Sequence, residues 1–226
     1  MANIGRQQRS ETRKPRILLS AAKLFLSNGY SKTTIKDIAK DAEATDNSIY
    51  FLFVDKESVL AELVNYVLGV QFKRTEKLLE NIPHDKIQFY AAETTLQLHI
   101  SESSEQVREI YAAAYSMPKT TTIIQDTITG KLEDIFKDSL PHLESKDFYE
   151  REIASGGIMR GFMTIPCDRY FTMDRKVSAF LESTFKIYDV PMEKIKESIE
   201  FVSQFDFAKI AQDTIHSMLS YLEEQT

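Results

Sequence analysis

Residues 13–60 read RKPRILLSAAKLFLSNGYSKTTIKDIAKDAEATDNSIYFLFVDKESVL, with apolar residues three or four positions apart. This period predicts an amphipathic helix over residues 14–27. Pro15 suits the first turn of that helix, because its missing N–H would have no partner there. Gly29 suits the position just after the helix end, where glycine readily adopts the left-handed conformation.

Two shorter helices are predicted next. Thr33 stands at an N-cap position before about two helical turns, which end near residue 42. Thr45 can cap a third helix that begins with Asp46, Asn47 and Ser48. Two short helices joined by a tight turn and packed on a longer one form a helix-turn-helix.

The rest of the chain also has helical periodicity, and no segment alternates as a strand does. A long fourth helix is predicted over residues 56–80, and the prolines lie between later helices. We therefore expect an all-α fold, with a three-helix domain over residues 1–60 and a larger helical bundle over residues 61–226. The boundary is placed inside the fourth helix because no flexible stretch lies near it. The later helices are expected at 85–102, 104–116, 118–138, 146–164, 172–188, 191–203 and 205–223.

Charge is distributed unevenly along the chain, whose formal net charge is −6. Residues 1–60 hold ten basic and seven acidic side chains, whereas residues 61–226 hold eighteen and twenty-seven. A basic arm on an acidic body indicates that one end meets a polyanion such as DNA. The alternative is a disordered, solvated tail.

Several classes of protein are disfavoured by composition. Cys167 is the single cysteine, which excludes an internal disulfide and favours a reducing cytoplasm. No uncharged apolar stretch approaches the ~20 residues of a membrane span. The four histidines are scattered, and no nucleotide-binding, metalloprotease or nucleophile motif is present. We expect no catalytic residue, no metal, no cofactor and no membrane association.

Residues 13–60 resemble the N-terminal domain of the TetR family, without gaps and over about a fifth of the chain. The resemblance implies a DNA-binding regulator with a variable, helical C-terminal domain. Three positions depart from the family pattern, namely Glu43 and Asn47, where the family has small residues, and Leu52, where it often has an aromatic. The matching positions are Ile17, Ala21, Ala22, Leu24, Phe25, Gly29, Tyr30, Thr33, Thr34, Ile35, Ile38, Ala39, Ala42, Ile49, Tyr50, Phe53, Lys56, Glu57 and Leu60.

DNA contacts are predicted around the third helix. Asn47 and its neighbours have short polar side chains that can reach base edges in the major groove. Plain helix capping is the alternative for them. The resemblance implies that Thr34, Tyr50 and Lys56 contact phosphates, against the alternative of a solvated lysine and a half-buried ring. The full predicted set is Arg6, Arg9, Thr33, Thr34, Thr45, Asp46, Asn47, Ser48, Tyr50 and Lys56.

An effector pocket is predicted in the C-terminal domain, although Met and aromatic residues at helical spacing are more often plain core. Arg160 has apolar neighbours, so we expect it to be buried and paired, with a carboxylate of the same chain or with an acidic ligand. Gly157 and Gly161 share a helix face and suggest close helix packing. The predicted pocket residues are His99, Tyr111, Tyr115, Met117, Met159, Arg160 and Phe162.

The sequence hypothesis is a homodimeric repressor that a small-molecule effector releases from a palindromic DNA operator, with the fourth helix linking the two sites. The alternatives are a regulator that responds to a partner protein or to no ligand, and a helical protein-interaction scaffold whose basic arm binds anionic lipid. The dimer interface is predicted on two C-terminal helices, with intramolecular packing as the alternative. Its apolar residues are Val177, Phe180, Leu181, Thr184, Phe185, Ile210, Ile215, Met218, Leu219 and Leu222.

Overall fold

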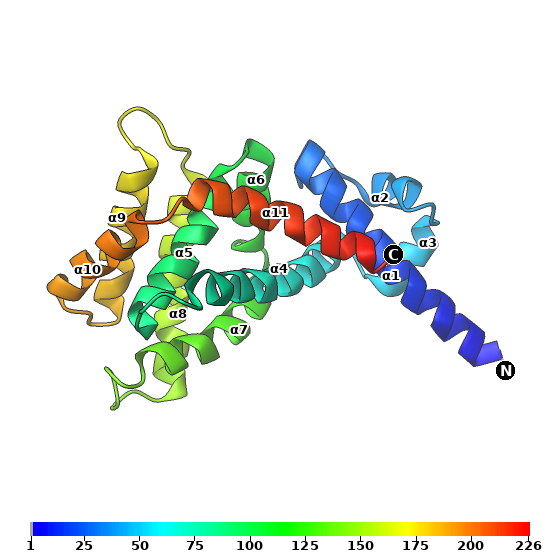
Figure 1. The fold of residues 1–226 in the computed structure, drawn as a ribbon. Coiled ribbons are helices and arrows are strands. Elements are labelled where there is room, and N and C mark those ends of the chain that lie inside the picture. The colour runs from blue at the N-terminus through cyan, green and yellow to red at the C-terminus, as the bar shows by residue number, and fades with distance from the viewer. Residues whose placement is uncertain (1) are drawn as a thin grey trace.

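The computed structural model describes residues 2–226, with side chains from residue 13 onward. This part of the chain is helical throughout, without a strand (Figure 1). The all-α fold is thus confirmed, and most helix ends lie within two residues of their predicted positions. The helices are α1 (Ala2–Asn28), α2 (Ile35–Asp41), α3 (Asp46–Leu52), α4 (Lys56–Leu79), α5 (Lys86–Glu102), α6 (Glu105–Ala114), α7 (Pro118–Phe136), α8 (Ser145–Thr164), α9 (Met173–Ile187), α10 (Met192–Ser203) and α11 (Phe207–Glu224).

The start of α1 differs from the prediction. The helix begins at Ala2, so Pro15 lies inside it and not in its first turn. A proline inside a helix removes one backbone hydrogen bond, which is why it usually marks a helix start. The residues before Pro15 include arginine, glutamine and glutamate, which are good helix formers and favour continuation of the helix.

The N-terminal helices α1 to α3 and the first half of α4 form a small head with its own core. Ile17, Phe25, Ile38, Ile49 and Leu60 are among its fully buried residues. Side-chain caps define the starts of α2, α3 and α4, because each accepts a hydrogen bond from a free backbone N–H. These caps are Thr34 for α2, Thr45 for α3 and Asp55 for α4.

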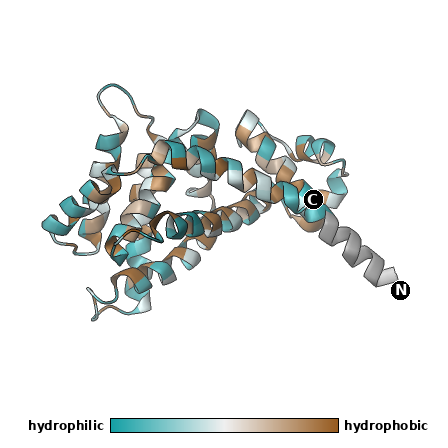
Figure 2. Cartoon of the chain, viewed as in Figure 1, coloured by the Kyte–Doolittle hydropathy of each residue, from teal (hydrophilic) through white to brown (hydrophobic). Residues whose placement is uncertain are grey.

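The second half of α4 and helices α5 to α11 form a larger part of the molecule, called the body here, with α5 at its centre. Residues 90–98 of this helix are buried on every side. A helix that is buried all round lies at the centre of its domain. Accordingly, α5 packs against α4 and against every helix from α6 to α11. The outer helices are amphipathic, and in Figure 2 they carry both hydrophobic and hydrophilic residues.

Head and body are joined by more than the shared helix α4. Helix α11 returns toward the head and packs against α1, where Lys23 and Glu223 form an ion pair of 2.8 Å (Figure 1). Helix α6 also packs against α1. The head core includes residues of α4 as far as Leu68. The boundary after residue 60 stays a prediction.

The apolar residues predicted to form a dimer interface lie mostly inside the chain. Val177, Phe180, Leu181 and Phe185 of α9 are buried in the body core. The corresponding face of α11 packs on α1, α4 and α5. Most residues of each stripe thus have apolar partners within the same chain, as the intramolecular alternative expects, and a contact of these helices with a second copy stays a prediction. None of the helices within residues 2–226 has the length and hydropathy needed to cross a bilayer.

Candidate functional site

The turn between α2 and α3 contains a left-handed residue, Glu43, with a φ of 50°. A residue other than glycine adopts this conformation at a cost of about 1–2 kcal/mol. The Glu43 carboxylate pairs with Arg16 of α1 at 3.0 Å. The turn between the helices therefore forms with a strained residue at its bend.

The first turn of α3 combines capping with free polar groups. The Thr45 hydroxyl accepts a hydrogen bond from the Ser48 backbone N–H at 3.2 Å and lies 2.9 Å from the Ser48 hydroxyl. Asn47 is exposed and makes no hydrogen bond within the described residues. The capping interpretation thus applies to Thr45, while the Asn47 amide is available to a partner.

The outer face of α3 continues into exposed apolar side chains. Tyr50 is 54% exposed, Phe51 83% and Val54 77%. Apolar side chains with so much exposure in neighbouring positions are typical of a contact surface. Sequence analysis missed Phe51 and Val54. The burial of Ile49 and Phe53, four residues apart on α3, would have placed Phe51 on the opposite face.

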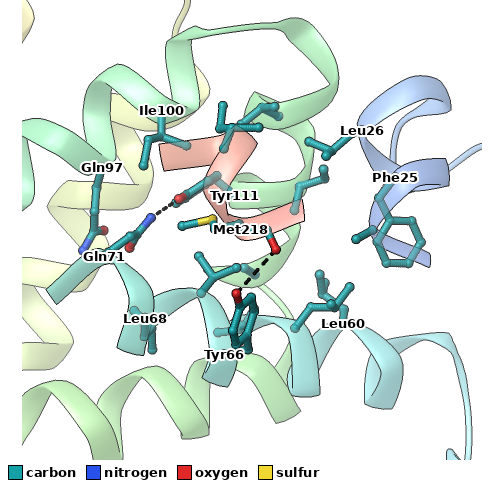
Figure 3. Close-up of a pocket in the computed structure, with 18 of the residues that line it drawn as sticks. Phe25, Leu26, Leu60, Tyr66, Leu68, Gln71, Gln97, Ile100, Tyr111 and Met218 are labelled. Carbon is teal, nitrogen blue, oxygen red and sulfur yellow. Dashed lines mark hydrogen bonds between the residues drawn. The ribbon is translucent and has the colours of Figure 1, made fainter. Parts of the chain in front are cut away.

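A cavity of about 110 Å³ lies where the head meets the body, between α1, α4, α6, α7 and α11 (Figure 3). Its walls are almost entirely apolar, with Phe25 and Leu26 of α1 on the side of the head. The polar exceptions include Gln71 and Tyr111, which are hydrogen-bonded to each other. The amide oxygen of the same glutamine, Gln71 Oε1, is buried without a hydrogen-bond partner.

A smaller cavity of about 30 Å³ lies deeper in the body, between α4, α5, α7 and α8. Gln97 and Tyr115 line both cavities and therefore lie between them. The Tyr115 hydroxyl donates to Gln97 Oε1 at 3.0 Å. Two buried acids, Glu93 and Glu152, also line the smaller cavity. Burial raises the pKa of Glu93 to about 7 and that of Glu152 to about 8.

Glu109 and Lys119 also connect the body to the head through hydrogen bonds. Glu109 of α6 accepts a hydrogen bond from the Ser31 backbone N–H at 2.7 Å. Lys119, at the start of α7, donates to Asp55 at 2.7 Å, and its backbone N–H donates to Glu57 at 2.7 Å. The helices that line the cavity thus hold the helix-turn-helix in its present orientation.

Residues 17–63, which include the whole helix-turn-helix, match the family described as bacterial regulatory proteins, tetR family. These residues therefore form a TetR-type DNA-binding domain. The matched family consists of bacterial regulatory proteins, and the expectation that the chain is not an enzyme stays a prediction.

Individual relatives, named as HTH-type transcriptional regulators, match only part of this chain. HbdR of Aromatoleum sp. strain CIB is 34% identical over 74 residues, which are 33% of this chain and 32% of HbdR. QacR of Staphylococcus aureus is 38% identical over 52 residues, which are 23% of this chain and 28% of QacR. The chain spans about a third of the length of the curated relatives it matches.

Solved structures extend the likeness in fold to the body. RolR in complex with the ligand resorcinol superposes with a TM-score of 0.66 at 15% identity, covering 88% of this chain and 97% of RolR. SmeT, the repressor of a Stenotrophomonas maltophilia multidrug efflux pump, gives 0.53 at 18% identity, covering 76% and 88%. The C-terminal helices therefore have an arrangement similar to that in RolR and SmeT.

Two residues of the predicted DNA-contact set, Thr33 and Lys56, are turned inward. Thr33 is fully buried, and its hydroxyl donates to the carbonyl of Gly29 at 2.8 Å, so its prediction as a DNA contact is wrong. Thr34, and not Thr33, caps α2 and is exposed. The Lys56 ammonium donates to the carbonyls of Tyr30 at 2.8 Å and Thr33 at 2.9 Å. Only one of its three N–H groups remains for a phosphate.

The basic arm is described only in part. Arg6 and Arg9 lie outside the residues whose side chains the structure describes. Arg13 and Arg16 line a polar hollow together with Thr45 and Ser48 of the α3 start. These two arginines are therefore better placed candidates for phosphate contacts than the sequence pattern indicated.

The predicted effector residues fall into three groups. Tyr111 and Tyr115 line the larger cavity, and Met159 lines the smaller one. His99, Met117 and Phe162 line neither cavity and pack in the core, with the His99 and Phe207 rings 5.8 Å apart and the Phe162 and Phe180 rings 5.9 Å apart. Arg160 is exposed, so its expected burial is wrong. It lies on the outer face of α8, where water solvates the guanidinium and no buried partner is needed.

Proposed function

We propose that this protein is a repressor that binds a palindromic DNA operator and acts in the cytoplasm. A small molecule bound in the larger cavity releases it from the operator. The observation that carries this proposal is the composition of the cavity wall. Phe25 and Leu26 belong to α1 of the head, whereas Tyr111 belongs to α6 of the body. An occupant that pushes these walls apart must change the angle between head and body.

The exposed side of the head suits DNA. Asn47 can form two hydrogen bonds with an adenine edge, and Phe51 can contact a thymine methyl group. Thr34, Arg13 and Arg16 border this face and can contact phosphates, which position the protein without reading sequence. We infer that α3 enters the major groove with this face toward the bases.

A homodimer is proposed through α8. Its exposed residues include Tyr149, Ile153, Gly157 and Gly161, at intervals of four positions, and the exposed Ile165 follows directly after the helix. A Cβ added at Gly157 or Gly161 would meet nothing within 4 Å. Small residues flanked by exposed isoleucines allow the same helix of a second copy to approach closely, as a two-fold interface requires. Two copies would present two heads to the two half-sites of a palindrome.

Coupling between effector and DNA is proposed to run through α6 as well as α4. Helix α6 carries Tyr111 at the cavity and Glu109 at the hydrogen bond to Ser31 of the head. A movement of α6 that accommodates a ligand would strain or break this bond. Allosteric coupling of this kind is typically ~1–3 kcal/mol and acts equally in both directions.

Resorcinol in the RolR structure supports a small aromatic molecule as one class of occupant for a cavity of this size. Titration of the DNA upstream of the gene, followed by fluorescence anisotropy, tests the proposal. We expect specific binding that an Asn47→Ala variant weakens, and sedimentation should give a dimer that Gly157→Arg dissociates. Absence of binding to upstream and to random duplex alike would refute the DNA-binding function.

A further inference from the structure

The strongest unexplained feature of the body is the pair of buried acids in the smaller cavity. Glu93 is 3% exposed and Glu152 4%. Glu93 accepts one hydrogen bond, from Gln97 Nε2 at 2.6 Å, and Glu152 accepts one from the Ser155 hydroxyl at 3.0 Å. The second oxygen of each carboxyl has no hydrogen-bond partner among the described residues, and neither group forms an ion pair there. Buried charges in proteins are normally paired.

We propose that the two cavities form one effector site for an aromatic amine, with its ring in the larger cavity and its ammonium group between Glu93 and Glu152. The proposal rests on the effector function proposed above and names the chemical class of the ligand. Two separate properties of the site support it, namely its charge and its division into an apolar and an acidic compartment.

The charge of the smaller cavity favours a single positive charge. Lys131 is the one basic residue that lines it, and its ammonium lies 4.9 Å from the centre of the Phe72 ring. When both carboxyls are ionised, they and the one lysine give the smaller cavity a net charge of −1. A monocation would neutralise this charge and give the free carboxylate oxygens their missing donors.

The shapes of the cavities favour a ring carried on a short chain. The larger cavity, at about 110 Å³, approaches the size of apolar cavities that hold one benzene ring. The smaller cavity, at about 30 Å³, has room for little more than a primary ammonium group. Tyr115 and Gln97 border both cavities, so a chain that displaces their hydrogen bond would connect the two compartments.

Helix α8 is shaped to place the acidic group. A Cβ added at Gly156 would lie only 3.2 Å from Glu152 Oε1, so the glycine leaves the space that this carboxyl occupies. Ser155 links the same carboxyl to the Tyr188 hydroxyl, 2.9 Å from the serine oxygen. Glu152 is thus held against the cavity wall by its neighbours.

Isothermal titration calorimetry of the full chain tests the proposal with phenethylamine and 4-phenylbutylamine as probes. The matched neutral probes are 2-phenylethanol and 4-phenylbutanol, and 4-phenylbutyrate is the anionic one. We expect at least one amine to bind about tenfold or more tightly than the alcohol of the same length, because hydrogen bonds to charged groups are the stronger ones. The anion should bind least.

Variants identify the groups responsible for the preference. Glu93→Gln/Glu152→Gln should remove the preference for the amine and retain binding of the alcohol, which also shows that the variant is folded. Glu150→Gln is the matched control, because Glu150 is an exposed acid on the same helix. It should keep the preference unchanged.

Proton release provides a measurement on the unaltered protein. Their pKa values of about 7 and about 8 leave Glu93 about half protonated and Glu152 mostly protonated at pH 7, so binding of an ammonium must displace protons into the buffer. The measured heat should therefore depend on the ionisation enthalpy of the buffer, for the amine and not for the alcohol. The other titratable groups around the cavity are Tyr90, Tyr115, Tyr188 and Lys131, and none of the tyrosines loses its proton in this range because burial raises their pKa values.

Equal affinities for amine and alcohol, absence of amine binding at millimolar concentration, or an amine preference that survives in the double variant would overturn the proposal. These outcomes are distinct from failure of the proposed function. Operator binding measured without any probe would remain intact if only the ligand class were wrong. An amine preference in a protein that binds no DNA would instead refute the repressor function.

Discussion

Glu43 has a left-handed backbone conformation, which is sterically unfavourable for a residue with a Cβ atom. Glu43→Gly should raise the free energy of unfolding by about 1 kcal/mol, because glycine adopts this conformation without the steric cost. The lost ion pair with Arg16 is exposed and contributes little. Urea denaturation measures the change. Glu43→Ala serves as the control, since it removes the ion pair and keeps the Cβ, and a gain equal to that of glycine would contradict the strain.

Asn47 should determine sequence preference, because its amide is free and lies in the first turn of α3. Asn47→Ala should cost about 1–3 kcal/mol on the operator and little on random duplex. Anisotropy titrations on operator and scrambled duplexes measure both losses. Equal losses, accompanied by a lower melting temperature, would mean that Asn47 acts only in starting the helix.

Lys56 should act on stability more than on DNA affinity. Its ammonium holds the carbonyls of Tyr30 and Thr33, which belong to the segment between α1 and α2. Lys56→Ala should lower the free energy of unfolding by about 1–3 kcal/mol, because two carbonyls lose a charged donor. Thermal denaturation beside Lys36→Ala, which removes an exposed lysine of α2, measures this effect. Matching melting temperatures for the two variants would rule out the structural role.

At the level of elements, a buried ion pair ties α5 to α9 and to the segment that precedes α9. The Lys176 ammonium is completely buried and pairs with Glu102 at 2.6 Å, while Glu102 also accepts from Cys167 N–H at 2.9 Å. Glu102→Gln should destabilise the fold by about 3–5 kcal/mol, because it leaves the lysine charge without its partner. Chemical denaturation measures the loss. Glu105→Gln, an exposed acid nearby, should have no such effect, and Glu102→Gln/Lys176→Met should recover part of the stability.

At the level of the whole molecule, the buried acids of the smaller cavity should make the fold less stable in alkaline solution. Burial raises the pKa of Glu93 to about 7 and that of Glu152 to about 8. The folded state therefore binds more protons than the unfolded state above about pH 4.5, and stability falls as pH rises to about 8. Glu152→Gln should reduce the loss of unfolding free energy between about pH 4.5 and pH 8 by an amount on the order of a few kcal/mol. Melting temperatures across this range test it, and parallel curves for both proteins would contradict the buried charge.

Local sequence signals were sufficient for the helix-turn-helix and for most helix ends, although not for the start of α1. Helix period, caps such as Thr45 and Asp55, and the intervening prolines act over a few residues, so they can be recognised without knowledge of the fold. The same signals misplaced Thr33 by one position, because two adjacent threonines are equally good caps. Only the packing of Thr33 against the α1 end distinguishes it from Thr34.

Tertiary structure alone decided which partner each face met. The stripes of α9 and α11 were visible as apolar faces, but hydrophobic period does not tell an intramolecular partner from a second chain. Arg160 was expected to be buried because its sequence neighbours are apolar, yet it is exposed together with Gly157 and Gly161. Neighbours in sequence therefore did not determine which side of α8 faces water. The acidic cavity had no sequence signal, since glutamates on helices usually face solvent. Glu93 and Glu152 are 59 positions apart, and only the packing of α5 against α8 brings them to one cavity.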